Sequence, residues 1–454
     1  MGLSIDDLQD SNRCVDRLLQ MGHRTETARQ KVDLLTKVAG AAATFCNADE
    51  EVHAFWVPGR IEVLGKHTDY VGGRSLLSAT GHGFFFMAQA QKDSDIEILD
   101  AVSGDKLSFQ IDPDLVPEVG SWGNYPQTVA RRLARNFPGP LKGARIFFGS
   151  DLPQAAGMSS SSAMIVGFYL LLARINSLDL TPEYCTNIKG MTDLSGYLGT
   201  IENGQTFGTL EGDRGVGTFG GSEDHTAILS CQPGTLSQYA FCPVRFERAV
   251  GLPEGYTFAI ASSGVVAEKT GKAMEKYNRA SRLAFAGVET WNKASGGADP
   301  HLAAAISHKT PDTIRSVLEA GGHPTFSSEE LVDRLDHFIA ENETFVPGAA
   351  NALAQGDLET FGTFVDCSQN LGASLLKNQV PETVFLAQEA RRLGAVAASA
   401  FGAGFGGSVW ALVSDTAVGP LLKKWEDVYR TEFPDRAARA SFFATDSGPA
   451  AFEI

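Results

Sequence analysis

Residues 58–73 contain several side chains that bind hydroxyl groups and anions. The segment has four glycines and, within ten residues, two cations, a histidine and an aspartate: Arg60, Lys66, His67 and Asp69. A high density of donors and acceptors on a glycine-rich backbone suits a ligand with many hydroxyl groups. The plainer alternative is a solvated hairpin with ordinary surface charges.

Residues 154–163, Gln-Ala-Ala-Gly-Met-Ser-Ser-Ser-Ser-Ala, suit the binding of a phosphate group. Small residues let a ligand approach the backbone, and the apolar run that follows predicts a buried helix whose first amides face the loop. Serine hydroxyls can also bind phosphate oxygens or Mg²⁺. No Gly-Lys-Ser/Thr follows the glycine, so the segment is not a Walker loop. The alternative is a helix that a serine caps.

Residues 401–408, Phe-Gly-Ala-Gly-Phe-Gly-Gly-Ser, form a third glycine-rich segment, and a strand is predicted directly after it at Val409–Val413. Glycines allow a close approach of backbone to ligand, but a tight turn before a strand has the same composition. Taken alone, this segment is weak evidence for a binding site.

The elements that must position these segments are a mixture of helices and strands in both halves of the chain, which predicts an α+β fold with two domains. Residues 1–48 are expected to be helical. Strands are expected at Val52–Val57, Ile61–Leu64, Phe84–Ala88, Ile96–Leu99 and Ala144–Phe148. Helices of the second half are expected at Glu268–Ala286, Pro311–Ala320, Ser327–Glu341, Asp357–Leu371 and Pro420–Tyr429.

Composition and charge exclude several classes of protein. The formal charge of −16 argues against nucleic-acid binding, which needs a basic surface. The longest apolar run, Ala163–Ala173, is too short to span a bilayer, and residues 1–6 lack a signal-peptide pattern. Six scattered cysteines without a CxxC pair favour free thiols in the cytoplasm. Nine histidines without an HExxH motif argue against a zinc site.

The three segments, in this order, resemble the GHMP kinases, and among these the galactokinases. Gly59–Gly73 resembles the sugar-binding signature, Gly157–Ala163 the serine-rich phosphate loop and Gly402–Gly407 the C-terminal glycine motif. The resemblance implies a two-domain GHMP kinase fold, with a ribosomal S5 domain 2-like N-terminal domain, a ferredoxin-like C-terminal domain and the active site in the cleft between them. The expected units are a helical extension (1–48), the N-terminal kinase domain (49–240) and the C-terminal kinase domain (241–454).

The resemblance also implies where the reaction takes place. The residues Gly220-Gly221-Ser222-Glu223-Asp224-His225 stand where galactokinases typically have Met-Asp-Gln, so Asp224 is the expected catalytic base. Glu223 is the competing assignment, one residue earlier. Arg60 matches the arginine that lies beside the base and stabilises the transferring phosphoryl group.

ATP and Mg²⁺ are the cofactors that the resemblance implies. The expected ATP-binding residues belong to the two loops: Gly157, Met158, Ser159, Ser160, Ser161, Ser162 and Gly404. The extra serine leaves both Ser160 and Ser161 as candidate Mg²⁺ ligands, together with Glu202. Because residues 208–217 resemble an insertion before the base, Glu211 is the alternative to Glu202.

The expected sugar-binding residues are Lys66, His67, Asp69, Gly221 and Tyr277. Lys66 departs from the family, which has a glutamate there that accepts a hydrogen bond from the hydroxyl on carbon 6; Glu62 replaces a usual asparagine. A lysine cannot accept a hydrogen bond, so a sugar acid such as galacturonate is one hypothesis. The alternative is that Lys66 pairs with Glu62 or Glu223 and that galactose is accepted.

The resulting prediction is an ATP-dependent kinase for the anomeric hydroxyl of galactose or a related sugar. A catalytically silent, galactokinase-like sugar sensor is the second class. Mevalonate or homoserine as substrate is disfavoured, because His67–Tyr70 match the sugar-binding branch. The expected partners are a small sugar and ATP, with no nucleic acid and no membrane; the oligomeric state stays open, with a monomer as the default.

Overall fold

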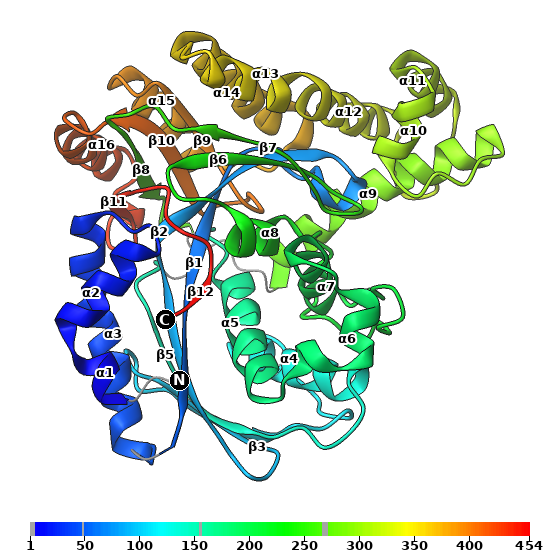
Figure 1. The fold of residues 1–454 in the computed structure, drawn as a ribbon. Coiled ribbons are helices and arrows are strands. Elements are labelled where there is room, and N and C mark those ends of the chain that lie inside the picture. Colours follow the sequence, from blue (N-terminus) through cyan, green and yellow to red (C-terminus); the bar gives the residue numbers. More distant parts are fainter. Residues whose placement is uncertain (1–4, 48–49, 154–156, 266–270) are drawn as a thin grey trace.

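The computed structural model describes residues 5–47, 50–153, 157–265 and 271–454, and its centre is a large, mostly antiparallel sheet (Figure 1). The strand order is β12-β1-β2-β5-β3-β4, and β6 pairs with both β2 and β7; only β3 and β5 are parallel. The strands are β1 (Val52–Leu64), β2 (Arg74–Ala90), β3 (Asp95–Asp100), β4 (Lys106–Gln110), β5 (Ala144–Ser150), β6 (Thr235–Ala240), β7 (Arg245–Gly251) and β12 (Phe452–Glu453).

Strand β1 is continuous, whereas the sequence predicted a break at Pro58-Gly59. Its pairing with β2 changes register between Pro58 and Arg60 and again between Glu62 and Leu64. Proline lacks an N–H group, and such a bulge lets the strand continue past it. At the first bulge the Arg60 amide donates to Met158 O (3.3 Å), so this irregularity joins the strand to the serine-rich loop.

Helices cover both faces of the large sheet. On one face lie α1 (Ile5–Gln9), α2 (Ser11–Gln20) and α3 (Thr25–Phe45), which are the helices expected in 1–48 (Figure 1). On the other face lie α4 (Asn124–Asn136), α5 (Ser160–Ile175), α6 (Pro182–Asn187), α7 (Met191–Asn203) and α8 (Glu223–Ser230). Successive side chains of β2 point to opposite faces of the sheet, so this strand contributes to the hydrophobic core on each face. Phe84 and Phe86 pack toward α5, and Phe85 packs toward α3.

The second sheet has the strand order β11-β8-β10-β9. Its strands are β8 (Tyr256–Ser262), β9 (Ala397–Ala400), β10 (Ser408–Ser414) and β11 (Ser441–Thr445), and the helices α15 (Pro381–Arg392) and α16 (Val418–Glu432) pack on it. A further helical layer comprises α9 (Gly271–Ser295), α10 (Leu302–His308), α11 (Pro311–Ala320), α12 (Ser328–Ile339), α13 (Val346–Ala354) and α14 (Leu358–Leu371). The predicted helices of the second half correspond to α9, α11, α12, α14 and α16, whereas α10, α13 and α15 were not predicted. Helix α9 continues beyond its predicted end at Ala286 to Ser295, and its predicted start, Glu268, lies outside the described residues.

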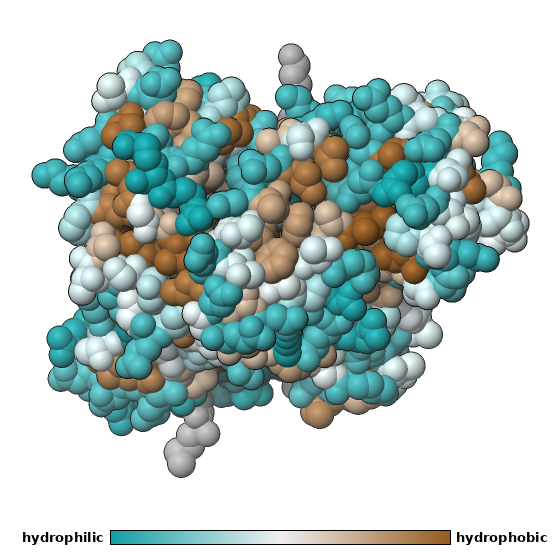
Figure 2. All heavy atoms as spheres, turned by 90° about the horizontal axis from the view of Figure 1, so that it is seen from above, coloured by the Kyte–Doolittle hydropathy of each residue, from teal (hydrophilic) through white to brown (hydrophobic). Residues whose placement is uncertain are grey.

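The predicted division at residue 240 cuts through the hairpin of β6 and β7. Both strands belong to the large sheet, and β12 returns to it from the other end of the chain. Seen from above, Figure 2 shows apolar side chains in several separate patches among hydrophilic ones. Among the described helices, none has the length and apolar character needed to cross a bilayer.

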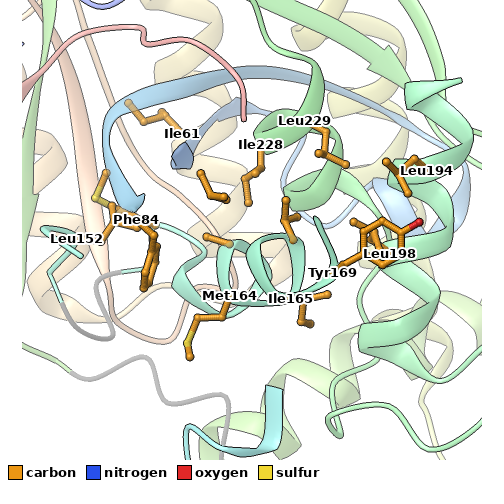
Figure 3. Packing of buried hydrophobic residues seen from close by; sticks show 14 of the residues in the cluster. Ile61, Phe84, Leu152, Met164, Ile165, Tyr169, Leu194, Leu198, Ile228 and Leu229 are labelled. Carbon is orange, nitrogen blue, oxygen red and sulfur yellow. The ribbon is translucent and has the colours of Figure 1, made fainter. Parts of the chain in front are cut away.

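Helix α5 is the most buried element near the serine-rich loop. Eleven of its sixteen residues are buried, and Figure 3 shows side chains of α7, α8 and β2 gathered around it. Because the helix is clamped on all sides, its first turn, and with it the loop, is held in a fixed position.

Truncation of Ile165 tests this anchoring. The side chain is fully buried, so Ile165→Ala should lower the free energy of unfolding by about 2–5 kcal/mol, as measured by chemical denaturation. The matched control is Leu170→Ala on the same helix, where the half-buried side chain should cost clearly less. Equal effects of the two variants would contradict the clamped position of α5.

Candidate active site

A cavity of about 440 Å³ brings all three sequence segments together. It is lined by residues of β1, the serine-rich loop, the glycine-rich loop and the first turn of α8, and by Tyr277 of α9. A further wall, which the sequence analysis missed, consists of Gly120, Ser121, Trp122, Asn124 and Tyr125.

The serine-rich loop has a backbone suited to an anion. Gly157 has φ +72° and Ser159 has φ +60°, and α5 begins at Ser160. The buried Ser159 Oγ has no hydrogen-bond partner among the described residues. The loop therefore presents a helix N-terminus and an unsatisfied hydroxyl beside the cavity. The predicted loop residues 154–156 lie outside the described residues.

Arg60 and Asp224 form the ion pair at the centre of the cavity. Arg60 Nε donates to Asp224 Oδ1 (2.7 Å), and its NH1 donates to Gly157 O (2.7 Å). The guanidinium also lies 5.7 Å from the ring centroid of Phe401. Burial alone would lower the pKa of Arg60, but Asp224 and the neighbouring glutamates raise it, so the cation is permanent.

Glu202 meets the serine-rich loop at Ser162. Ser162 Oγ donates to Glu202 Oε2 (2.8 Å) and to Asp224 Oδ2 (3.3 Å), and Thr218 Oγ1 donates to Glu202 Oε1 (3.4 Å). The buried His225 Nε2 lies 3.3 Å from the same carboxylate. Glu202 is thus at the cavity as expected, but the serine that reaches it is Ser162, one residue beyond the predicted Ser160 and Ser161.

Ser160 and Ser161 also line the cavity. The alternative ligand Glu211 is exposed. It lies in an excursion (204–221) that is tied to α4 by the Arg131–Asp213 pair (2.6 Å). Near its end, this segment lies against α7, because the Val216 amide donates to Glu202 O (2.8 Å). This contact brings Thr218 to the Glu202 carboxylate.

Asp69, Gly221 and Tyr277 lie together as predicted. Asp69 Oδ2 accepts from the Glu223 amide (3.2 Å), and a Cβ at Gly221 would lie 2.3 Å from that oxygen, so only glycine fits there. Burial raises the pKa of Asp69 to about 6. A Cβ at Gly220 would lie 2.5 Å from the hydroxyl of Tyr277, so the backbone here passes close under the tyrosine.

His67 lines the cavity, but both its ring nitrogens bond to the protein. Nδ1 lies 2.9 Å from the hydroxyl of Tyr70 and Nε2 lies 3.0 Å from Ala403 O. Burial and the nearby Arg334 lower the pKa of His67 to about 4, so the ring is neutral and Nε2–H is the donor to the carbonyl. His67 therefore positions the glycine-rich loop and has no ring N–H left for a ligand.

Lys66 is not at the cavity, which corrects its prediction as a sugar-binding residue. Its ammonium is buried and donates to Ser399 Oγ (2.8 Å) and Ser368 Oγ (3.0 Å) on the side of β9 and α14. Buried Glu341 bonds to the same Ser368 and supplies the opposite charge. The structure thus removes the basis for a sugar acid as substrate, and the predicted pairing of Lys66 with Glu62 or Glu223 is not seen either.

Glu62 and Glu223 instead face the cavity as a buried pair. Glu223 accepts from Ser75 Oγ (2.7 Å), and the two glutamates share a hydrogen bond that requires a proton. Burial raises the pKa of Glu62 to about 7 and raises that of Glu223 well above its usual value. In the sequence, the only sign of this pair is that Glu62 stands where galactokinases usually have an asparagine.

The glycine-rich loop closes the cavity against the serine-rich loop. Gly402 has φ +79°, and a Cβ there would lie 2.9 Å from Gly157 O and 3.3 Å from the Arg60 guanidinium. Gly404, with φ +77°, lines the cavity and passes close to Asn378. Trp122 and Tyr125 provide the aromatic wall of the cavity, and no pattern around them marked them in the sequence.

Three protein-family models match parts of the chain that contain the three binding segments. Residues 124–200 match the GHMP kinases N terminal domain, residues 42–90 the galactokinase galactose-binding signature and residues 349–431 the GHMP kinases C terminal domain. The galactokinase of Halalkalibacterium halodurans is 26% identical over 392 residues, covering 86% of this chain and 89% of the relative. The galactokinase of Roseiflexus sp. is 26% identical over 80% of this chain and 83% of its own length.

Solved structures share the fold. A Lactococcus lactis galactokinase complexed with galactose has a TM-score of 0.75 at 21% identity, covering 92% of this chain and 98% of that one. A D-glycero-D-manno-heptose 1-phosphate kinase from Bacteriodes thetaiotaomicron has a TM-score of 0.52 at 14% identity, covering 89% and 99%.

The contact between the serine-rich loop and the glycine-rich loop predicts that Gly402→Ala weakens nucleotide binding selectively. The added Cβ should push the loops apart and weaken nucleotide binding by about tenfold, as measured by calorimetry. The control is Gly394→Ala, which has φ +100° but open space around it. Both variants should lose about 1–2 kcal/mol of stability from the left-handed backbone. Unchanged nucleotide affinity in Gly402→Ala would contradict the role of the contact.

Proposed function

Because the chain is a galactokinase-like member of the GHMP kinase superfamily, we propose that it transfers the γ-phosphoryl group of ATP to the anomeric hydroxyl of galactose or a closely related sugar. The observation that carries the proposal is the position of the Arg60–Asp224 pair. It lies in one cavity between a phosphate-binding loop and the group of Asp69, Gly221 and Tyr277.

The nucleotide occupies the side of the cavity formed by the two loops and the aromatic wall. Trp122 and Tyr125 offer flat apolar faces for a base. The phosphates lie at the N-terminus of α5, where the amides and the unsatisfied Ser159 hydroxyl donate hydrogen bonds. The chain as a whole is acidic, so this local arrangement supplies the binding of an anion.

Asp224 is the base. It takes the proton of the sugar hydroxyl as that oxygen bonds to the γ-phosphorus and the bond to the ADP oxygen breaks. Arg60 holds the carboxylate through Nε (2.7 Å) and stabilises the charge on the phosphoryl group as it transfers. The sugar is placed by the buried Asp69 carboxylate, which accepts hydrogen bonds from its hydroxyls.

Ser162 and Glu202 are the residues that would hold Mg²⁺. Both are oxygen donors at the cavity, and they already lie 2.8 Å apart. The described residues contain no cluster of three or more metal-binding side chains, which fits an ion that takes most of its ligands from phosphates and water. When bound, Mg²⁺ would neutralise charge on the phosphates of ATP.

A panel of sugars offered with ATP tests the proposed function. Phosphorylation of galactose or a relative on carbon 1, with the position read by NMR, is the expected outcome. Phosphorylation on another carbon, or of a non-sugar alcohol alone, would overturn it.

Asp224→Asn tests the assignment of the base. Loss of the proton acceptor should lower kcat by about 10²–10⁴-fold or more, while ATP affinity measured by calorimetry changes little. The neighbouring Glu223 is the competing base, and full activity in Asp224→Asn would move the assignment to it.

Substitution of Glu202 tests the site for Mg²⁺. Glu202→Gln should raise the Mg²⁺ concentration needed for half-maximal activity by about tenfold or more, since a charged oxygen ligand is lost. Glu211→Gln is the control, because that carboxylate is exposed and away from the cavity. Similar Mg²⁺ dependence of both variants would contradict the role of Glu202.

A further inference from the structure

Two buried carboxylates in the active-site cavity form no ion pair among the described residues, although Arg60 and Lys66 act on the Glu62 carboxyl from a distance. Glu62 is 3% exposed and Glu223 is 5% exposed, and both line the cavity. Glu62 Oε1 and Glu223 Oε1 are the buried carboxylate oxygens that have no hydrogen-bond donor in the part of the chain that the structure describes. Buried carboxylates normally have a cation or several donors, so a ligand that supplies donors to these two oxygens would relieve an unfavourable arrangement.

The cations around the pair are already in use. Arg60 bonds to Asp224 and to Gly157 O, and Lys66 bonds to two serines beside Glu341. The other groups that face the pair are Asp224 and Asp69, which are themselves acidic, and the Ser75 hydroxyl, which bonds to Glu223 Oε2. Once Glu62 has lost its proton, the pair therefore carries one negative charge that no cation of the described residues contacts directly.

The pair lies next to the reacting hydroxyl of the substrate. Glu223 directly precedes the base Asp224 at the start of α8, and Glu62 follows Arg60 by two residues on β1, so both line the same cavity as the ion pair. Because the base contacts the anomeric hydroxyl in the proposed reaction, the pair faces the part of the sugar around carbons 1 and 2.

We propose that Glu62 and Glu223 form a cation-recognition site and that the preferred substrate is a 2-amino sugar whose ammonium group binds between the two carboxylates. This inference rests on the proposed function, because it takes the position of the sugar from it. In the free protein at pH 6 both carboxyl groups are protonated, because burial raises both pKa values; when the ammonium binds, Glu62 releases its proton to solvent and Glu223 keeps the proton that the two share. The ammonium then donates to Glu62 Oε1 and Glu223 Oε1, the two oxygens that lack donors.

The test compares galactosamine, galactose and N-acetylgalactosamine as substrates with ATP. The first has an ammonium at carbon 2, the second a hydroxyl and the third an uncharged amide. We expect kcat/KM for galactosamine to exceed that for the other two by about tenfold or more, the size of one charged hydrogen bond. Higher kcat/KM for galactose or for N-acetylgalactosamine would overturn the inference.

The variant Glu62→Gln keeps the shape and removes the charge. It should lower kcat/KM for galactosamine by about tenfold more than it lowers kcat/KM for galactose, and an unchanged midpoint of thermal unfolding would show that the variant is folded. Glu97→Gln, an exposed carboxylate on β3, is the control and should change neither value. An equal loss for both sugars in Glu62→Gln would overturn the site.

Two readouts separate this inference from the proposed function. Calorimetry in two buffers should show release of about one proton per galactosamine bound at pH 6, below the raised pKa of about 7 at Glu62, and none for galactose. Accordingly kcat/KM for galactosamine should rise as the pH rises through about 7, because Glu62 then loses its proton. Proton release without phosphorylation of any sugar would refute the kinase function alone; phosphorylation of galactosamine without proton release would refute the cation site alone.

Discussion

The bonds of the Arg60 guanidinium hold the active site together. Through two of its three nitrogens it joins three parts of the chain that are far apart in sequence: β1, which carries it, the start of α8 at Asp224 and the serine-rich loop at Gly157. Its contact with the Phe401 ring adds the glycine-rich loop from the second sheet. Because arginine keeps its charge even when buried, one side chain can fix the position of all four elements.

Backbone strain gathers around this centre. Of the six residues other than glycine with positive φ in the described structure, His67, Ser159 and Phe405 belong to the three binding segments. Such conformations persist where surrounding contacts outweigh their cost. At His67 these contacts are hydrogen bonds: Arg334 donates to the His67 carbonyl, and the two ring nitrogens bond to Tyr70 and to Ala403 O.

The residue types at short range predicted the three segments and their order, whereas the pairing of Arg60 with Asp224, 164 residues apart, followed from the family resemblance. Prediction failed where an outcome depended on distant partners. Pro58 suggested a break in the strand, but a bulge paired to the serine-rich loop absorbs it. Lys66 was expected at the ligand; serines on β9 and α14, more than 300 residues away, draw its ammonium to the other side. The serine that contacts Glu202 depends on the residue at which α5 begins. Four consecutive serines give no signal for that starting residue.

The pairing of β12 with β1 has a consequence for synthesis of the chain. Phe452 pairs with Trp56, Ile454 N donates to Ala54 O (2.9 Å), and both apolar side chains complete the core under α1–α3. While the ribosome is still adding residues, this edge of the sheet stays unpaired for almost 400 positions after β1 has emerged. A nascent chain thus carries an open strand edge until residues 452–454 have emerged, and during that time the unpaired edge is a site for pairing with other chains.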